Sequence, residues 1–474
     1  MVEFLRYNKT ASVSHTTSRG CNGNLCILRN EMSKYKKTRK KLQQIETVQE
    51  YRIHYLFAVP GIFMCLLTLL ILSMDVVVPG MADDQYDVYP SFFRMINWLI
   101  AACGVGYWIY LIRLKQKRSF TFANRAATIC FALFLLCIVI STVVNGFDEK
   151  ALHGVSFRNI GIFHIFAFAM IYMFLSSKIS RERFRNMIVI SFVAVSDALA
   201  LSVLINLPLK FISAFENKKD LSAIFFNGNH YGYFLVMAIL LAAGLFVWHD
   251  SRIVRVLGIF SMLLNSGLLL LNGSVGCILS VFLTLVVVFI LSFVFWKESV
   301  KRLAFIFGFI LLGVLTGFIL ADGLRNDFLS LADDIHRMLF ADVSGSAGHN
   351  RWLLWQTTWE YIKQKPLLGY GCEGLDIPLL ADTGRGNPHN EILNYAGQFG
   401  IPAACLYVAG VISTLVHAVN NHTSAAQKDA FMAASGYFIS SMFGVPMFYT
   451  LPFFFIFLGI AGSAVPMVTG RTHF

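Results

Sequence analysis

Residues 275–296 read VGCILSVFLTLVVVFILSFVFW, a run that contains no charged side chain. A helix that crosses the hydrocarbon core of a bilayer needs about 20 apolar residues, so this run predicts a transmembrane helix. Similar runs recur along most of the chain, and together they predict about twelve spans. The predicted spans are residues 56–74, 93–112, 126–144, 160–176, 187–207, 231–248, 254–271, 275–296, 303–321, 396–417, 430–448 and 452–468.

The composition of the whole chain agrees with this interpretation. Of its 474 residues, 56% are hydrophobic and 14% are charged, whereas a soluble domain carries about 25% charged residues. These proportions exclude an ordinary soluble enzyme, a disordered protein and a nucleic-acid-binding module. The sequence therefore predicts an all-α integral membrane protein with about twelve transmembrane helices and no nucleic-acid partner.

The positive charges predict which side of the membrane each loop faces. Residues 1–53 hold 11 of the 39 Lys and Arg residues but 4 of the 27 Asp and Glu residues, so we expect a disordered basic tail in the cytoplasm. Met32 is an alternative start to Met1. The basic loops at 113–125, 178–185, 252–255 and 297–302 then also face the cytoplasm.

This orientation predicts the order of the domains. A cytoplasmic tail at residues 1–53 precedes nine spans within 54–321, an extracytoplasmic loop at 322–388, and three spans with a short cytoplasmic end within 389–474. The loop is too long for a simple connector, and loops longer than about 15 residues are usually functional. Its stretches 324–340 and 350–363 are amphipathic, the second with three tryptophans on one stripe, so we expect a helical lid on the outer surface of the cytoplasmic (inner) membrane.

The strongest local signal for chemistry is Asn387-Pro388-His389-Asn390 at the end of this loop. Asn387 suits an N-cap and Pro388 suits the first helical position, so we expect His389 in the first turn of a helix that enters the membrane. The positive end of that helix favours a neutral imidazole, which can accept a proton from an attacking hydroxyl, and its exposed amides attract phosphate. The alternative is an interfacial histidine that hydrogen-bonds lipid headgroups.

Two further places offer groups for a phosphorylated or sugar ligand. Arg351 opens the tryptophan stretch beside Trp352, and a guanidinium can hold pyrophosphate in bidentate fashion. The alternative is an arginine that snorkels to headgroups above an aromatic belt. Asn229 and His230 lie at the start of the sixth predicted span, where they either bind a sugar or phosphate or form a polar helix cap.

Several other polar residues have weaker claims. His349 and Arg385 are read more simply as solvated side chains. Asp197 lies inside the fifth predicted span, where an ionisable group is costly, so it is either functional or a buried, hydrogen-bonded structural residue. The acidic loop at residues 83–87 could clamp a divalent ion or could be merely solvated. We predict no metal site and no cofactor.

Taken together, these features resemble the O-antigen ligase and O-antigen polymerase family of bacterial polysaccharide assembly. The resemblance covers about residues 221–410 and rests on an ordered set of short motifs. They are the turn Asn227-Gly228-Asn229 before a span, Arg351-Trp352 on a loop helix, and His389-Asn390 followed by Leu393 and Gly400. One element departs from the family's pattern, because Ser274-Val275-Gly276 stands where the family has Ser-Arg-Gly. Arg385 is a candidate replacement for the missing arginine.

The resemblance implies a multispanning, GT-C-like glycosyltransferase architecture and a metal-independent, inverting transfer. The implied donor is a glycan on undecaprenyl pyrophosphate, and the implied acceptor is a hydroxyl of a glycan, a lipid or a wall polymer, with membrane lipids around both. The resemblance leaves ligase and polymerase open. The residues expected to carry the reaction are His389 and Arg351 as catalytic groups and Asn390, Arg385, Asn229, His230 and Trp352 as substrate-binding groups.

A polyisoprenoid-glycan flippase or another multispanning transporter is the alternative that hydropathy allows equally well. A transporter places its ionisable groups near the bilayer midplane. In this chain most polar candidates gather at the predicted outer surface, which favours the enzyme.

Overall fold

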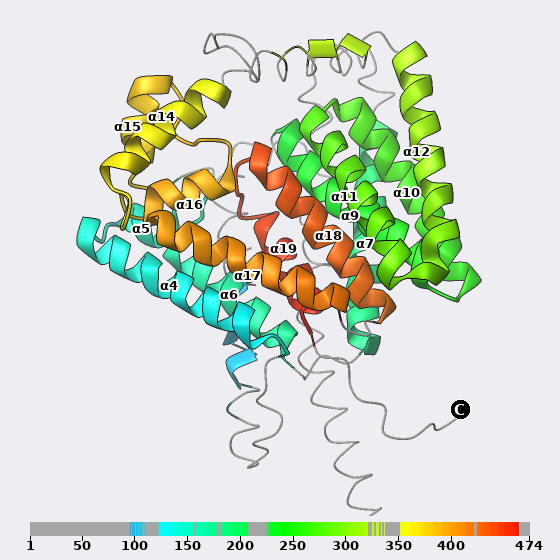
Figure 1. Ribbon diagram of the computed structural model, residues 1–474, viewed down its shortest axis with the longest axis horizontal. Coiled ribbons are helices and arrows are strands. Elements are labelled where there is room, and N and C mark those ends of the chain that lie inside the picture. The colour runs from blue at the N-terminus through cyan, green and yellow to red at the C-terminus, as the bar shows by residue number, and fades with distance from the viewer. Residues whose placement is uncertain are drawn as a thin grey trace, which may run out of the picture. The chain divides into compact units, whose positions relative to one another are not determined.

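The computed structural model describes residues 123–155, 158–177, 182–206, 227–320, 351–420 and 424–463, together with Phe225 and scattered residues within 95–109 and 325–336. These residues form helices and no strand (Figure 1). The α-helices are α4 (Arg125–Asn145), α5 (Glu149–His153), α6 (Ile162–Ser176), α7 (Glu182–Asn206), α9 (Gly228–Trp248), α10 (Arg252–Asn272), α11 (Val275–Phe295), α12 (Val300–Leu320), α14 (Arg351–Gln364), α15 (Asp376–Thr383), α16 (Glu391–Phe399), α17 (Ile401–Asn420), α18 (Ala425–Ser440) and α19 (Leu451–Ala461). Two 3₁₀ turns, η5 (Lys297–Ser299) and η6 (Ser441–Phe443), precede α12 and follow α18.

Six of the described helices are long and apolar enough to cross a membrane, namely α4, most of α7, α9, α10, α11 and α17. The expectation of an all-helical membrane protein is therefore confirmed. Each of the third to twelfth predicted spans overlaps a helix, but the first span and most of the second lie outside the described residues. With 16 and 11 residues, α18 and α19 are only about 24 and 17 Å long, less than the roughly 30 Å of hydrocarbon, so twelve spans remain a prediction.

Helix α9 lies at the centre of one group of helices, with α10 and α18 packed along it (Figure 1). It is apolar on all sides and almost completely buried, as expected of a helix with no solvent face. Small residues allow the close packing: a Cβ at Gly244 would meet Asp429 of α18, and a Cβ at Gly436 would meet Leu240 of α9. The start of α9 is thereby fixed at one end of the group.

Aromatic side chains hold a second group, formed by α4, α6, α17 and α19. The ring of Phe131 lies 4.6 Å from that of Tyr172, 6.5 Å from that of Tyr407 and 6.1 Å from that of Phe455, all edge-on. The hydroxyl of Tyr172 hydrogen-bonds Thr414 at 2.8 Å. Each of these rings comes from a different helix, so this cluster joins the four helices.

Asp197 belongs to a buried polar contact between α7 and α10. Its carboxylate accepts hydrogen bonds from Ser261 and, at 2.8 Å, from Asn265, which in turn accepts from Ser196 at 2.6 Å. Hydrogen bonds of this kind join helices in an apolar environment. The arrangement favours the structural interpretation of Asp197.

The tenth predicted span is wrong as a continuous helix, because the chain breaks at Gly400 between α16 and α17. The loop after α14 pairs with this break. Tyr370 N–H donates to the carbonyl of Gly397 at 3.0 Å, Gly371 N–H donates to that of Gln398 at 2.8 Å, and Ile401 N–H donates to that of Pro366 at 2.8 Å. Three backbone hydrogen bonds thus attach the loop to the ends of both helices.

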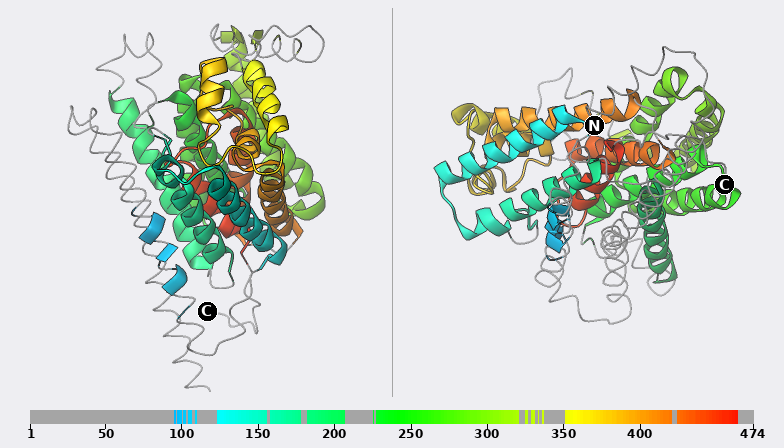
Figure 2. Two further views of the ribbon diagram at one scale, coloured as in Figure 1. Left: turned by 90° about the vertical axis from the view of Figure 1, so that its left-hand side faces the viewer. Right: turned by 90° about the horizontal axis from the view of Figure 1, so that it is seen from below.

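The loop that was expected to be helical contains α14 and α15, which contact each other and lie beside α16 (Figures 1 and 2). Residues 351–388 are called the lid below, and their place on the outer surface stays a prediction. The stretch 350–363 forms α14 as expected, whereas most of 324–340 lies outside the described residues. The buried face of α14 consists of Leu354, Thr358 and Ile362 rather than the tryptophan stripe, and Trp359 is exposed. This face holds α14 against α15 and α16.

The break at Gly400 supplies a test of the pairing. Gly400 has a φ of +90°, and a Cβ there would lie 2.1 Å from the carbonyl oxygen of Leu367. Gly384 has a φ of +71° with no atom within 4 Å of its Cβ position. Gly384→Ala should cost about 1 kcal/mol of unfolding free energy from backbone strain alone, whereas Gly400→Ala should cost at least ~3 kcal/mol because the loop must also move. Denaturant unfolding in detergent measures both, and equal losses would contradict the pairing.

Candidate functional site

His389 lies directly before α16 rather than inside a helix. Asn390 is the N-cap of α16, since its Oδ1 accepts from the N–H of Leu393 at 3.0 Å. The expected helix start at Asn387 and Pro388 is therefore wrong. Asn387 instead closes a short turn, accepting from His389 N–H at 2.9 Å and donating to Asn394 Oδ1 at 3.1 Å.

The turn holds His389 in an unusual backbone conformation. Its φ is +53°, which few residues other than glycine adopt. Besides the Asn387 contact, Trp355 of α14 donates from Nε1 to the carbonyl of Pro388 at 3.0 Å. Strained conformations of this kind cluster at functional sites, where the surrounding contacts enforce them.

The surroundings of His389 favour the neutral imidazole. The pKa of His389 is lowered to about 3, most strongly by burial and also by the positive charges of Arg351, Arg385 and Arg158 and by His230. The expected neutral imidazole therefore holds, although through burial and these neighbours rather than through a place inside the first turn of a helix. Arg351 and His230 thus act on His389 from α14 and α9, whereas Arg385 lies in the same loop as His389.

Arg351 lies where the lid meets the helices. It is the first residue of α14, and its guanidinium acts electrostatically on Tyr233 of α9 and Cys277 of α11 as well as on His389. Trp352 follows it, and its buried Nε1 has no hydrogen-bond partner among the described residues.

A polar patch forms where the start of α9 meets the turn between α10 and α11. Ser274 Oγ donates to Asn229 Oδ1 at 2.6 Å. The amide of Asn272 packs against Gly228, and both its Nδ2 and its Oδ1 are buried without a hydrogen-bond partner among the described residues. Ser274-Val275-Gly276 begins in this turn and continues into α11, so uncharged groups occupy the position where an arginine is expected.

His230 is less accessible than expected for a substrate-binding residue. It is buried, with its Nδ1 2.7 Å from the hydroxyl of Tyr449, and that hydroxyl donates to the carbonyl of Phe225 at 3.0 Å. A hydroxyl that has donated its proton accepts from the imidazole, so Tyr449 orients the ring. His230 therefore lies beneath the site.

The sequence missed Arg158, in the loop before α6. Its Nη2 forms ion pairs with both Glu373 and Asp376 of the lid, and its Nη1 lies 3.5 Å from the carbonyl of Gly386. Burial raises the pKa of Glu373, and Arg158 opposes that rise. The one feature of the sequence that could have indicated Arg158 is its place in a loop predicted to face outside, where the positive-inside rule disfavours basic residues.

The remaining candidates divide into two groups. Arg385 is exposed at the edge of the site, whereas the side-chain oxygen of Asn390 accepts the hydrogen bond that caps α16. His349 and the acidic loop at 83–87 lie outside the described residues.

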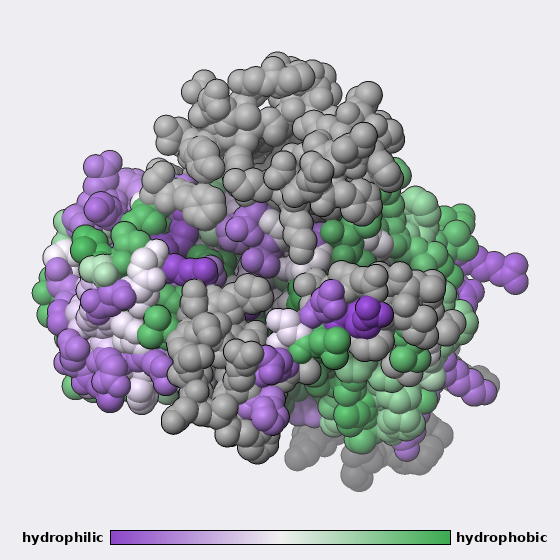
Figure 3. All heavy atoms as spheres, turned by 90° about the horizontal axis from the view of Figure 1, so that it is seen from above, coloured by the Kyte–Doolittle hydropathy of each residue, from purple (hydrophilic) through white to green (hydrophobic). Residues whose placement is uncertain are grey.

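The residues of the site therefore gather at one end of the helices. In Figure 1 the start of α9, the end of α10 and the lid all lie toward the top. Seen from that end, hydrophilic residues cover the side that carries α14 and α15, while hydrophobic residues cover the side that carries α10 and α12 (Figure 3).

Residues 259–408 of the chain match the family model described as O-antigen ligase. The match runs from α10 into α17, so it confirms the resemblance over a range that includes Ser274, Arg351 and His389. It does not include Asn229, His230 or Arg158. No curated protein matches the chain. The family match, together with the apolar helices, favours a membrane-bound glycan ligase or polymerase.

Arg158 supplies a test of what holds the lid. Arg158→Met leaves the buried Glu373 without its partner, so we expect a loss of about 3–5 kcal/mol in unfolding free energy at pH 8. The loss should shrink at acid pH, because a protonated carboxyl no longer needs the guanidinium. Lys363→Met is the matched control, since Lys363 and its partner Glu360 are 52% and 64% exposed, and it should change stability by less than ~1 kcal/mol.

His389 supplies a test of the electrostatics. In the free protein its imidazole should stay neutral from pH 8 down to pH 5, as followed by NMR of labelled histidine. Since an unfolded histidine takes up a proton near pH 6.5, the contribution of His389 to stability should fall as the pH drops from about 6.5 toward 3. Arg351→Gln removes a nearby cation and should raise the pKa of His389. An unchanged pKa would place the guanidinium elsewhere.

Proposed function

We propose that this protein is a membrane glycosyltransferase that moves a glycan from undecaprenyl pyrophosphate to an acceptor hydroxyl at the outer face of the cytoplasmic membrane. The proposal rests on the contact between α14, which Arg351 opens, and the turn that carries His389. Trp355 Nε1 donates to the carbonyl of Pro388 at 3.0 Å, and the Arg351 guanidinium acts electrostatically on His389. Both residues lie within the range that matches O-antigen ligase. The acceptor is a hydroxyl of a glycan, a lipid or a wall polymer.

Arg351 and Arg385 are the groups proposed to bind the donor's pyrophosphate. Arg158 is already paired with two carboxylates, so its charge is largely balanced, whereas Arg385 is exposed. A planar guanidinium binds two phosphate oxygens at once. Charge that develops on the departing pyrophosphate is then stabilised by fixed cations, and the chemistry proposed needs no metal ion.

His389 is proposed to act as the general base. The acceptor oxygen attacks the anomeric carbon from the side opposite the pyrophosphate, the bond from that carbon to the pyrophosphate oxygen breaks, and the acceptor's proton passes to the imidazole. One displacement of this kind inverts the configuration. The proton then leaves to solvent or to the released pyrophosphate.

Binding of the donor should also activate this base. A pKa of about 3 is too low for an efficient base near neutral pH, because the ideal catalytic pKa lies near the working pH. The negative pyrophosphate would offset the charges of Arg351 and Arg385 and so raise the pKa of His389. The protein would thereby hold a competent base only when its donor is bound.

A transporter of lipid-linked glycans is the second candidate, and the placement of polar groups argues against it. Asp197, an ionisable side chain within a candidate span, is hydrogen-bonded to α10 rather than facing a polar passage, and the other candidates lie at one end of the helices. A ligase and a polymerase use the same chemistry on different acceptors. Glycans from a deletion strain separate them, since stalled single repeats indicate a polymerase and complete unattached chains indicate a ligase.

The proposal predicts the effect of removing the base. His389→Ala should lower the rate of glycan transfer from a lipid-linked donor in proteoliposomes by about 10²–10⁴-fold. The exposed Lys363→Ala in the same lid should leave the rate unchanged. A folded, fully active His389→Ala protein would exclude the assigned role. Movement of the lipid-linked glycan across the bilayer without bond formation would favour the transporter.

A further inference from the structure

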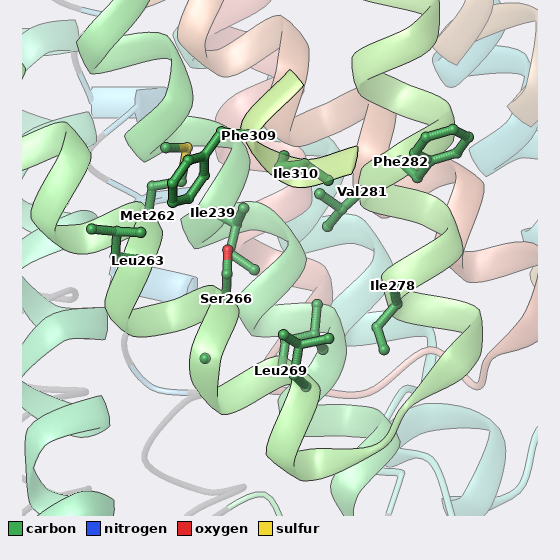
Figure 4. Close-up of a pocket in the computed structure, with 12 residues that line it drawn as sticks. Ile239, Met262, Leu263, Ser266, Leu269, Ile278, Val281, Phe282, Phe309 and Ile310 are labelled. Atoms are coloured by element: carbon green, nitrogen blue, oxygen red, sulfur yellow. The ribbon is translucent and has the colours of Figure 1, made fainter. Parts of the chain in front are cut away.

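A cavity of about 250 Å³ lies between α9, α10, α11 and α12 (Figure 4). Met262 and Leu269 of α10 face Ile278 and Val281 of α11 across it, and Phe309 of α12 lies at its edge. Of the described side chains that line it, all but Ser266 are apolar. A site for a free sugar needs several polar groups, so this cavity fits a hydrocarbon ligand instead.

The cavity has a buried floor and an exposed rim. On α10, Met262 and Leu269 are 5% and 3% exposed, whereas Leu263 and Leu270 are 48% and 42% exposed. Phe309 of α12 is 46% exposed. In a helix that spans a membrane, such exposed apolar residues face lipid, so the cavity opens sideways toward the bilayer.

One end of the cavity adjoins the polar patch of the candidate site. Leu270 lies two residues before Asn272, and Ile278 lies four residues after Ser274, which places the apolar lining about 3–6 Å along the helix axis from the polar groups. The amide of Asn272 is buried and has no hydrogen-bond partner among the described residues. A polar group of this kind is costly unless a ligand or water satisfies it.

We propose that this cavity holds the part of the donor's polyprenyl chain nearest the pyrophosphate, with Asn272 at the junction of chain and headgroup. The identity of the ligand rests on the proposed function. A lipid-linked donor must place its headgroup among polar residues while its chain returns to the bilayer. The side opening of the cavity and its polar end at the α10–α11 turn provide that path.

Two glycines provide a matched pair of variants. Gly267 lines the cavity, Gly308 of α12 does not, and a Cβ at either position would meet no atom within 4 Å. Gly267→Phe therefore adds a ring at the mouth of the cavity with no atom in contact with its Cβ, and Gly308→Phe adds the same ring outside the cavity. Undecaprenyl pyrophosphate and inorganic pyrophosphate are the two probes, with binding measured for the full-length protein in phosphatidylethanolamine nanodiscs.

Gly267→Phe should weaken the binding of undecaprenyl pyrophosphate by about tenfold or more and leave that of inorganic pyrophosphate unchanged. Gly308→Phe should leave both unchanged. If Gly267→Phe fails to fold, Ser266→Phe fills the same space. Equal affinity of a folded filling variant and the unmodified protein for the lipid probe would overturn the proposal. Displacement of the probe by an equal concentration of phosphatidylglycerol would also overturn it, because the cavity would then be a general lipid site.

The test separates this inference from the proposed function. If the unmodified protein binds undecaprenyl pyrophosphate in the cavity but never transfers a glycan from it, the cavity assignment stands and the transferase proposal fails. If transfer occurs and the filling variants bind and react normally, the transferase proposal stands and the cavity assignment fails.

Discussion

The constraint on which the rest depends is that backbone polar groups in an apolar environment must be paired within the protein. The helix predicted at residues 396–417 breaks at Gly400, and the loop after α14 supplies the partners of the Gly397 and Gln398 carbonyls. Ser141 of α4 also donates to Gln398, at 3.0 Å. The lid is therefore attached to the break and to α4. Because α16 begins eight residues before its end at this break, the same pairing fixes the place of His389.

The charges at the site are arranged in a way that suits an anionic ligand. Arg158 forms ion pairs with Glu373 and Asp376, which largely balance its charge and hold the lid. Arg351 and Arg385 are the other positive charges that act on the neutral imidazole of His389. The turn at Ser274-Val275-Gly276 adds hydroxyl and amide groups but no charge.

The same end of the molecule combines polar and apolar recognition. The start of α9 and the turn between α10 and α11 form the polar patch, and the next turns of α10 and α11 line the apolar cavity. One pair of helices thus contributes to both surfaces. This continuity suits an amphiphilic ligand, whose two halves must be bound within a few ångströms of each other.

Local sequence patterns determined the helices, because hydropathy acts over about 20 neighbouring residues. They also determined the residue types of the candidate site, because the chemistry of a side chain follows from the identity of its residue. Tertiary structure decided the rest. Asn387 and Asn390 are both good N-caps, and the contact of Asn387 with Asn394 settled which one caps α16. The orientation of the His230 ring depends on Tyr449, and the role of Arg158 depends on carboxylates more than 200 residues away. Such long-range pairings leave no local pattern, so only the folded chain could show them.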